Sequence, residues 1–464
     1  MKKIVVKNGI IVTAQESVTA DLLISGDKIT RIASRIEVAA AIEVIDAAGC
    51  YVLPGGVDVH THLNLALDPR HVSDGFYQGM RAAAFGGTTT IVDHPEAGPA
   101  GCSLFYQPDF YRQKLEKEAV IDYGIHGVFQ RVDADILQQI PELVNSGIPS
   151  IKAYLTYDGM LQDDEVEQVL RAMGPAHGLT AFHAEDDETI KRLREKYGQE
   201  GKLTAIYHAK SRPDYAESDA IRRILEIAAR CGNVPVYIVH LSTAKGLEEI
   251  KKARQKGQQV FAETCPQYLL LNQSCYEQEG GEGLKYIMAP PLRTAEDQEA
   301  LWQGVIDGSI DVIATDHCSF SFADKVKYGK DDFRQCPGGC PGVETRLPII
   351  YSAAVDKGLF SINRFVALVA TNPAKIMGLY PRKGALQVGA DADLILWNPN
   401  LEKTVSVETL HQKCDYTPFA GMTTKGWPVL TMVRGEVIVN NGIFSGGKGS
   451  GCFIKRKLDI TESA

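Results

Sequence analysis

The sequence predicts an α/β protein in which a (β/α)8 TIM barrel is joined to a smaller β-sheet domain that both ends of the chain can build. Three observations lead to this fold class. The chain has 464 residues, about three times the usual length of one domain. Its middle alternates short apolar runs with longer amphipathic stretches, whereas both ends carry short β-type runs without a helical period.

The middle of the chain contains eight strand-like runs, each followed by a stretch of helical character. Eight β-then-α units are the number that closes a (β/α)8 barrel. We therefore place a catalytic barrel domain at residues 54–380. The eight runs are residues 57–59, 88–92, 122–128, 150–155, 179–182, 234–239, 259–262 and 311–314.

The two ends of the chain are expected to build the second domain together. Residues 1–53 contain short β-rich runs broken by Gly and Asp, and the alternation returns within residues 381–464. We assign the first segment to the N-terminal part of this β domain. The second segment is assigned to its C-terminal part and to a C-terminal arm, with a glycine-rich loop at residues 445–451.

Composition and charge exclude several classes of function. The formal net charge of −9 provides no basic footprint for nucleic acid or for anionic lipid. No apolar run is long enough to span a bilayer, and the apolar run after Lys3 is too short for a secretory signal. Ten widely spread cysteines are typical of reduced thiols. We expect a cytoplasmic protein with a small-molecule substrate and neither nucleic acid nor membrane as a partner.

His60 and His62 are the first candidates for a chemical role. They are two residues apart on a predicted strand, so both side chains leave the same face and can bind one ion. Taken alone, such a pair is more often a coincidence or two hydrogen-bonded core imidazoles. The metal interpretation therefore needs support from other strands.

That support comes from four residues at or near the ends of other predicted strands. Lys152 lies in the fourth run, His183 follows the fifth, His240 follows the sixth and Asp316 follows the eighth. Each has a structural alternative: a surface amine, a core histidine or a helix cap. Independent polar residues have no reason to share matching strand ends, whereas the C-terminal ends of barrel strands meet at one mouth. Together they predict a metal site.

Lys152 is the most informative of these residues. A protonated ammonium beside two divalent cations would be repelled by several kcal/mol, even at a generous effective dielectric constant. A lysine carbamate, formed with carbon dioxide, would remove this conflict and would offer two anionic oxygens to two ions. We expect Lys152 to be carboxylated.

Four segments carry a resemblance to a known family: LPGGVDVHTH at 53–62, IKAYLTY at 151–157, ETCPQYL at 263–269 and TDHC at 315–318. They resemble the hydantoinase and dihydropyrimidinase branch of the amidohydrolase superfamily, and bacterial D-phenylhydantoinases in particular. The resemblance runs nearly end to end. It implies that the β domain is a β-sandwich formed from both chain termini, at residues 1–53 and 381–464. It also implies a hydrolase that opens 5-monosubstituted hydantoins, dihydropyrimidines or both to N-carbamoyl amino acids, and a homotetramer.

The same resemblance implies a role for each candidate ligand. Two divalent ions, expected to be Zn²⁺, are held by two sets of residues that share one bridging group. The first set is His60, His62 and Asp316, the second set is His183 and His240, and carboxylated Lys152 bridges both ions.

Two residues are implied to act on the substrate directly. Tyr157 matches the tyrosine of the family that hydrogen-bonds the reacting carbonyl oxygen. Asp316 is placed to accept a proton from the attacking nucleophile and then to pass it to the leaving nitrogen. His94 and His317 lie beside the barrel mouth and are expected to support the ligands.

Two positions depart from the pattern of the family. Ala289 stands where family members commonly have Ser, and Thr345 stands where they commonly have Asn. Both positions are implied to bind the ring amide mainly through main-chain groups, so binding is expected to survive. The preference between hydantoins and dihydropyrimidines, the enantioselectivity and the physiological substrate stay open.

Two rival functions fit the sequence less well. An allantoinase or dihydroorotase is disfavoured, because Asn64 stands where dihydroorotases usually carry Arg. Gln267 and Cys318 also resemble the hydantoinase side. A non-catalytic dihydropyrimidinase-related scaffold would have lost metal ligands, whereas all six ligand positions are filled here.

Overall fold

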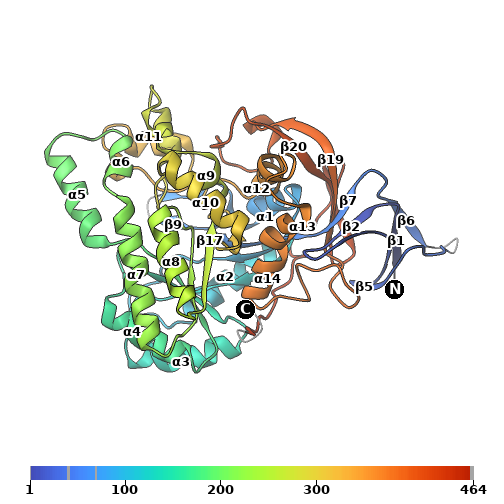
Figure 1. Cartoon of the computed structure of the whole chain (residues 1–464), viewed down its shortest axis with the longest axis horizontal. Helices are drawn as coiled ribbons and strands as arrows, with labels where there is room; N and C mark the ends of the chain where they lie inside the picture. Colours follow the sequence, from blue (N-terminus) through green and yellow to red (C-terminus); the bar gives the residue numbers. More distant parts are fainter. Residues whose placement is uncertain (1, 39–41, 68–69, 460–464) are drawn as a thin grey trace.

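The computed structural model describes residues 2–38, 42–67 and 70–459. The predicted fold class is confirmed: helices surround a set of parallel strands, and an all-β layer lies at one side of them (Figure 1). The barrel strands are β8 (Gly56–Thr61), β11 (Thr88–Asp93), β12 (Asp122–Ile125), β13 (Gly127–Val128), β14 (Ser150–Tyr154), β15 (Leu179–His183), β16 (Val236–Ile238), β17 (Val260–Thr264) and β18 (Val312–Ile313).

The barrel closes where β8 meets the end of β18. The backbone N–H of Asp316 donates to the carbonyl oxygen of His60 at 2.8 Å. The buried guanidinium of Arg346 donates to the carbonyl oxygens of Val57 on β8 and Ile313 on β18, at 2.9 and 3.1 Å. The closure therefore lies directly beside the predicted metal ligands.

The long amphipathic helices turn their apolar faces to the core, and several helices, such as α3, α5 and α8, start at side-chain caps. In α4 the buried residues Val166, Val169, Leu170 and Met173 follow helical spacing, so one face turns to the core. The side chain of Asp133 accepts from a backbone N–H in the first turn of α3. The helices are α1 (Gly75–Phe85), α2 (Tyr106–Glu118), α3 (Ala134–Asn145), α4 (Asp163–Met173), α5 (Asp187–Gln199), α6 (Ile206–Lys210), α7 (Asp214–Arg230), α8 (Ala244–Gln255), α9 (Pro266–Leu270), α10 (Ala295–Asp307), α11 (Phe322–Gly329), α12 (Arg346–Ile350), α13 (Ile362–Val366) and α14 (Asn372–Ile376).

Short irregular helices complete the loops around the barrel. Those of 3-10 type are η1 (Gln273–Glu277), η2 (Glu282–Tyr286), η3 (Phe333–Gln335) and η6 (Val407–Thr409). Those of π type are η4 (Tyr351–Val355) and η5 (Ala367–Thr371). None of the helices in the described ranges is long and apolar enough to cross a membrane.

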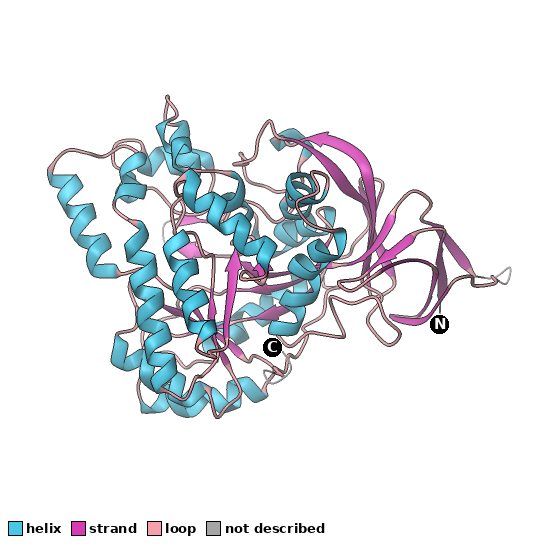
Figure 2. Cartoon of the chain, viewed as in Figure 1, coloured by secondary structure: helices cyan, strands magenta, loops and turns pink. Residues whose placement is uncertain are grey.

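The β-sandwich consists of a four-stranded and a seven-stranded sheet (Figure 2). Leu22 and Ile24 belong to the same buried apolar cluster as Leu394 and Met432, so the two ends of the chain share one core. The first sheet has the order β5 (Lys28–Ala33), β4 (Asp21–Ser25), β1 (Lys3–Lys7), β6 (Glu43–Asp46). The second has the order β22 (Ile443–Phe444), β21 (Glu436–Asn440), β20 (Thr423–Val433), β19 (Leu394–Thr404), β7 (Tyr51–Pro54), β2 (Ile10–Val12), β3 (Ser17–Thr19). A separate two-stranded ribbon pairs β9 (Ala66–Leu67) with β10 (Arg70–His71).

A buried ion-pair network joins the barrel to the sandwich. The Lys383 ammonium lies 2.5 Å from Asp122 of β12, 2.7 Å from Asp393 and 3.0 Å from Asp391. The three carboxylates are close enough together to suggest a cation site. Lys383 shares this cluster with three further cations, Arg434 on Asp122 and Lys28 and Arg382 on Asp391, so protein cations already balance the carboxylates and the role of the cluster is structural.

The C-terminal segment packs under the barrel. The glycine-rich residues 445–451 form a loop, as predicted, and the Gly451 N–H donates to the Ala119 carbonyl at 3.0 Å. Further on, Ile454 bonds to the backbone of Tyr123 at 2.8 Å. The buried guanidinium of Arg456 donates to Ile125 at 2.7 Å. The arm is thus anchored at the end of the barrel opposite the predicted site.

Candidate metal centre at the barrel mouth

The histidine pair on β8 converges with the aspartate that follows β18. His60 and His62 direct their Nε2 atoms at the same carboxylate oxygen of Asp316, at 3.2 and 3.3 Å. All three side chains are buried. Their ligand atoms lie close enough together to hold one metal ion. These three side chains therefore converge on one point, as the sequence predicts.

Lys152 reaches the same point from β14. Its Nζ lies 3.4 Å from Nε2 of His60, and the side chain is fully buried. Burial lowers the pKa of Lys152 to about 8, although the nearby Asp316 carboxylate opposes this shift. A larger fraction of this amine is therefore neutral than for an ordinary lysine.

His183 and His240 form the second half of the cluster. His183 ends β15, His240 follows β16, and Nδ1 of His183 lies 2.9 Å from Nε2 of His240. The Nδ1 atom of His240 is buried and has no hydrogen-bond partner among the residues that the structure describes. The rings of His240 and His60 lie 5.3 Å apart. All six predicted ligands thus lie in one continuous cluster.

Glu263 at the end of β17 orients two of these histidines. Its carboxylate lies 2.6 Å from Nδ1 of His60 and accepts the backbone N–H of His240 at 3.1 Å. The Tyr237 hydroxyl donates to its other oxygen at 2.8 Å. Burial raises the pKa of Glu263 to about 7, although the bond from Tyr237 lowers it. A carboxylate behind a ligating imidazole fixes which ring nitrogen faces the metal.

Glu185 plays the same part for His183. Its carboxylate lies 2.8 Å from Nε2 of His183 and accepts a hydrogen bond from the Arg212 guanidinium. Burial alone would raise the pKa of Glu185, but Arg212 and His183 hold it at about 2. Glu185, Glu263 and Arg212 were not predicted from the sequence. The available signal for Glu185 and Glu263 was their position at or after barrel strands, whereas Arg212 lies between α6 and α7 and has no such signal.

Tyr157 lies next to the cluster, and its backbone has a strained conformation. Its φ is 76°, and φ is also positive at His240 (37°) and Asp316 (52°). Such values are rare for residues other than glycine and gather at functional sites. The ring of Tyr157 lies 5.3 Å from that of His183, and its oxygen lies 3.3 Å from Arg212. The tyrosine is thus close to the second half of the cluster.

The two additional histidines take different positions. The ring of His94 lies 4.5 Å from that of His60 and stacks on His126 at 3.8 Å, so it packs against the ligand cluster. His317 instead faces away: its Nε2 lies 2.9 Å from Asp74. Its Nδ1 accepts the backbone N–H groups of Gly342 and the next residue at 3.0 and 3.1 Å. His317 therefore orders the turn that leads to Thr345.

The two predicted substrate-binding positions lie on separate loops. Ala289 is half-buried and precedes a cis peptide bond to Pro290. Thr345 is buried, and its hydroxyl donates to the Gly342 carbonyl of its own turn at 3.2 Å. The side chain of Thr345 is thus occupied within the turn, and contact of either residue with a substrate remains a prediction.

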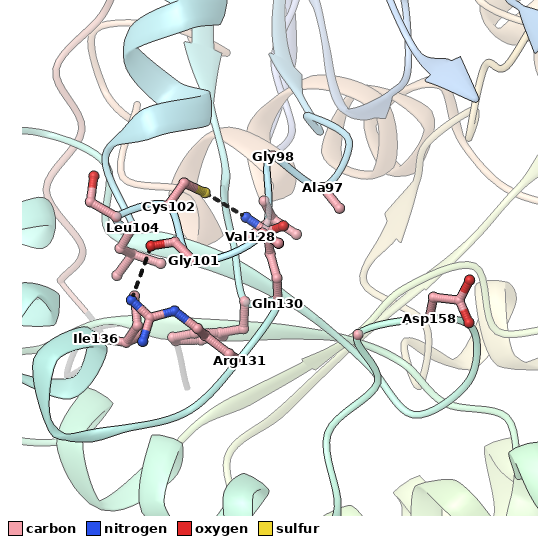
Figure 3. Close-up of a pocket in the computed structure, with 14 residues that line it drawn as sticks. Ala97, Gly98, Gly101, Cys102, Leu104, Val128, Gln130, Arg131, Ile136 and Asp158 are labelled. Atoms are coloured by element: carbon pink, nitrogen blue, oxygen red, sulfur yellow. Dashed lines mark hydrogen bonds between the residues drawn. The ribbon is translucent and has the colours of Figure 1, made fainter. Parts of the chain in front are cut away.

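A pocket of about 410 Å³ is lined by none of the six predicted ligands (Figure 3). It is bordered by the loop after β11, by the end of β13 and by the two residues that follow Tyr157. Its wall is mostly apolar, and its polar members include Gln130, Arg131 and Asp158. Because Asp158 and Gly159 border this pocket, it adjoins the segment that carries Tyr157. The lining is 97–98, 100–104, 128–131, 136 and 158–159.

Comparisons with known proteins agree with this barrel and cluster. The family model described as "Amidohydrolase family" matches residues 51–438. A D-phenylhydantoinase of Escherichia coli O1:K1 / APEC is 45% identical over 98% of each chain. The crystal structure of dihydropyrimidinase from Brevibacillus agri NCHU1002 has a TM-score of 0.96 and 38% identity, covering 98% of this chain and 99% of that one. An L-hydantoinase (dihydropyrimidinase) from Arthrobacter aurescens has a TM-score of 0.90 and 31% identity, covering 98% and 100%.

The fold and the family match together define the class of protein: a hydrolase of the amidohydrolase type, with a barrel and a sandwich to which both ends of the chain contribute. The chain belongs to the amidohydrolase family, and within it to the hydantoinase and dihydropyrimidinase group.

Proposed function

We propose that this chain is a binuclear metal-dependent cyclic amidohydrolase. It would hydrolyse the ring amide of 5-monosubstituted hydantoins, dihydropyrimidines or both to N-carbamoyl amino acids. The observation that carries the proposal is the convergence of six residues of potential metal-binding type, from five different barrel strands, in one buried cluster. The printed names of the relatives, D-phenylhydantoinase and dihydropyrimidinase, support the same reaction class.

The residues of the cluster fit two divalent ions. Burial lowers the pKa of His60, His183 and His240, so these imidazoles are neutral and able to coordinate a metal. Asp316 is the complementary anion, because His60 and His62 hold its pKa at about 2 despite its burial. A set of imidazole and carboxylate ligands suits Zn²⁺. Bound ions would polarise the ring carbonyl and increase the acidity of the attacking water at neutral pH.

Lys152 is proposed to bridge the two ions as a carbamate. Its amine would attack the carbon of carbon dioxide and release one proton. The product would be a carboxylated nitrogen whose two oxygens share the negative charge. The lowered pKa of Lys152, about 8, favours the neutral amine that this reaction needs. Carboxylated Lys152 would be a ligand of both ions, and His183 and His240 would be the other ligands of the second ion.

Tyr157 and Asp316 are proposed to act on the substrate. The Tyr157 hydroxyl would donate to the carbonyl oxygen as negative charge develops there, which typically contributes a few kcal/mol. Asp316, ionised at neutral pH, would accept a proton from the attacking water. It would then return the proton to the leaving ring nitrogen. Ala289 and Thr345 are proposed to border the ring amide.

The wider expectations remain proposals of the same kind. We propose the division into 1–53, 54–380 and 381–464, a homotetrameric assembly and a cytoplasmic location. The shared sandwich core supports the domain division. The assembly rests on the resemblance to the family, and the location rests on the cysteines, all ten of which are free.

A substrate panel tests the proposed reaction against its rivals. Purified enzyme is assayed with 5-monosubstituted hydantoins in both enantiomers, dihydrouracil, allantoin and dihydroorotate, with Asp316→Asn as the matched inactive control. We expect the highest kcat/KM on a hydantoin or on dihydrouracil. Turnover of allantoin or dihydroorotate alone would assign the chain to the rival enzymes, and no turnover at full metal content would favour the scaffold.

A further inference from the structure

Arg212 is a buried cation that touches the candidate site without being one of its ligands. It lies between α6 and α7 and is 4% exposed. One end of its guanidinium donates to the Glu185 carboxylate, and the other donates to the Tyr157 hydroxyl oxygen at 3.3 Å. Arg212 therefore connects the support of His183 with the tyrosine above it.

The backbone of Arg212 is held in place independently of these contacts. Its N–H donates to the Ala209 carbonyl at 3.0 Å, and its carbonyl accepts a hydrogen bond from the guanidinium of Arg293. The next residue, Pro213, caps α7 with a φ of −63°. The guanidinium thus extends from a rigid point, and its ion pair with buried Glu185 fixes its orientation further.

Tyr157 depends on such an anchor more than its neighbours do. Tyr157 is 42% exposed, and its backbone φ is 76°. Asp187 holds the backbone by accepting from the Tyr157 N–H at 3.4 Å and from the Thr156 hydroxyl at 2.9 Å. Arg212 holds the hydroxyl. Without the second contact the phenol would be free to leave the mouth of the barrel.

We propose that Arg212 is a positioning residue that fixes the Tyr157 hydroxyl over the candidate metal centre and determines which way its proton points. An arginine side chain carries only donors. The Tyr157 oxygen therefore accepts from Arg212, and its own proton is left free for the carbonyl oxygen of the substrate. This inference rests on the proposed function only for its kinetic consequence.

The substitution that tests this role is Arg212→Lys. Lysine keeps the positive charge beside Glu185, so the fold is preserved, but a single ammonium cannot hold both Glu185 and Tyr157 in the way a planar fork does. We expect kcat to fall about tenfold and KM to change less than about threefold. This fall in kcat is smaller than the roughly hundredfold fall expected for Tyr157→Phe, because that variant removes the hydrogen-bond donor itself.

A double-mutant cycle separates positioning from a general structural effect. If Arg212 acts through the Tyr157 hydroxyl, the Arg212→Lys/Tyr157→Phe double variant should be no more than about twofold slower than Tyr157→Phe alone. The matched control is Arg223→Lys, because Arg223 also pairs with two carboxylates, Asp163 and Asp186, but on the exposed side of α7. Its kinetics should match the wild type.

A crystal structure of substrate-free Arg212→Lys provides a readout that does not require turnover. We expect the Tyr157 hydroxyl to leave its wild-type position while the metal content stays unchanged. An unmoved tyrosine, a wild-type kcat, or a loss that is fully additive with Tyr157→Phe would overturn the role of Arg212. A wild-type enzyme that opens none of the rings would refute the proposed function instead, and the crystal structure would still decide the role of Arg212.

Discussion

At the scale of single residues, Lys152 is the residue whose charge state is most restricted by the electrostatics of the site. Its amine is fully buried and lies 3.4 Å from a ring nitrogen of His60. An ammonium at this point would repel any divalent ion bound by the neighbouring imidazoles. The proposed carboxylation of Lys152 would resolve this conflict and would turn this amine into a bridging ligand.

Replacement of Lys152 by Ala should therefore abolish ring opening while the fold is retained. The expected loss follows from removal of the only group proposed to bind both ions. Turnover of a hydantoin and far-ultraviolet circular dichroism would be measured together. Short carboxylic acids added to the assay should restore some of the activity by occupying the vacated space. Near-wild-type turnover of Lys152→Ala without such acids would refute the bridging role.

The sequence predicts the convergence of the candidate ligands better than it predicts the groups that hydrogen-bond to them. His183, His240 and Asp316 follow predicted strands, and the ends of barrel strands share one mouth, so their convergence could be anticipated. Glu185 and Glu263 could not be distinguished in advance among 58 acidic residues. A carboxylate supports a histidine only when side-chain directions agree in space, and local sequence does not encode those directions.

At the scale of secondary-structure elements, Arg346 is central to the closure of the barrel. It donates to the backbones of β8 and β18 and to the Thr88 hydroxyl of β11 at 3.1 Å. Its Nε lies 3.9 Å from the buried carboxylate of Asp58. From the sequence, this turn is expected only to influence substrate preference. The structure adds that its arginine holds three barrel strands together.

Arg346→Met should lower the free energy of unfolding by about 3–5 kcal/mol, because it leaves the buried Asp58 carboxylate without its cation. Urea denaturation followed by circular dichroism measures this change. The control is Arg31→Met on the exposed face of β5, which should change stability by less than about 0.5 kcal/mol. Equal stability of both variants would show that Arg346 does not hold the closure.

The element boundaries show where sequence periodicity is sufficient. All eight predicted runs contain a barrel strand, because strands buried on both faces read as apolar runs. The run predicted at 122–128 is divided into β12 and β13 at His126. Short helices such as α6 and α9, and the π-helical η4, were not predicted because five residues are too few to show a period.

At the scale of the whole molecule, long-range pairing creates the second domain. Leu53 of β7 pairs with Ile395 of β19, across most of the length of the chain. Local patterns indicate strands at both ends but do not specify such partners, so the sandwich rested on the family resemblance. The buried Lys383 network and the C-terminal arm then fix the two domains to each other.

The reaction class follows from the metal centre, whereas substrate choice depends on loops at the barrel mouth. Tyr157, the turn at Thr345 and the pocket bordered by Asp158 all lie on such loops. Loop shape depends on tertiary contacts like those of Arg212, which no motif in the sequence records. This is why the family could be predicted from the sequence while the preferred ring could not.

The central claim is that the cluster at the barrel mouth binds two metal ions. Its most direct test is metal analysis of the purified protein by mass spectrometry, with ring-opening activity followed before and after chelation. We predict about two divalent ions per chain, most of them Zn²⁺, and loss of activity on chelation that returned metal reverses. Fewer than about one ion per chain in fully active protein would contradict the account.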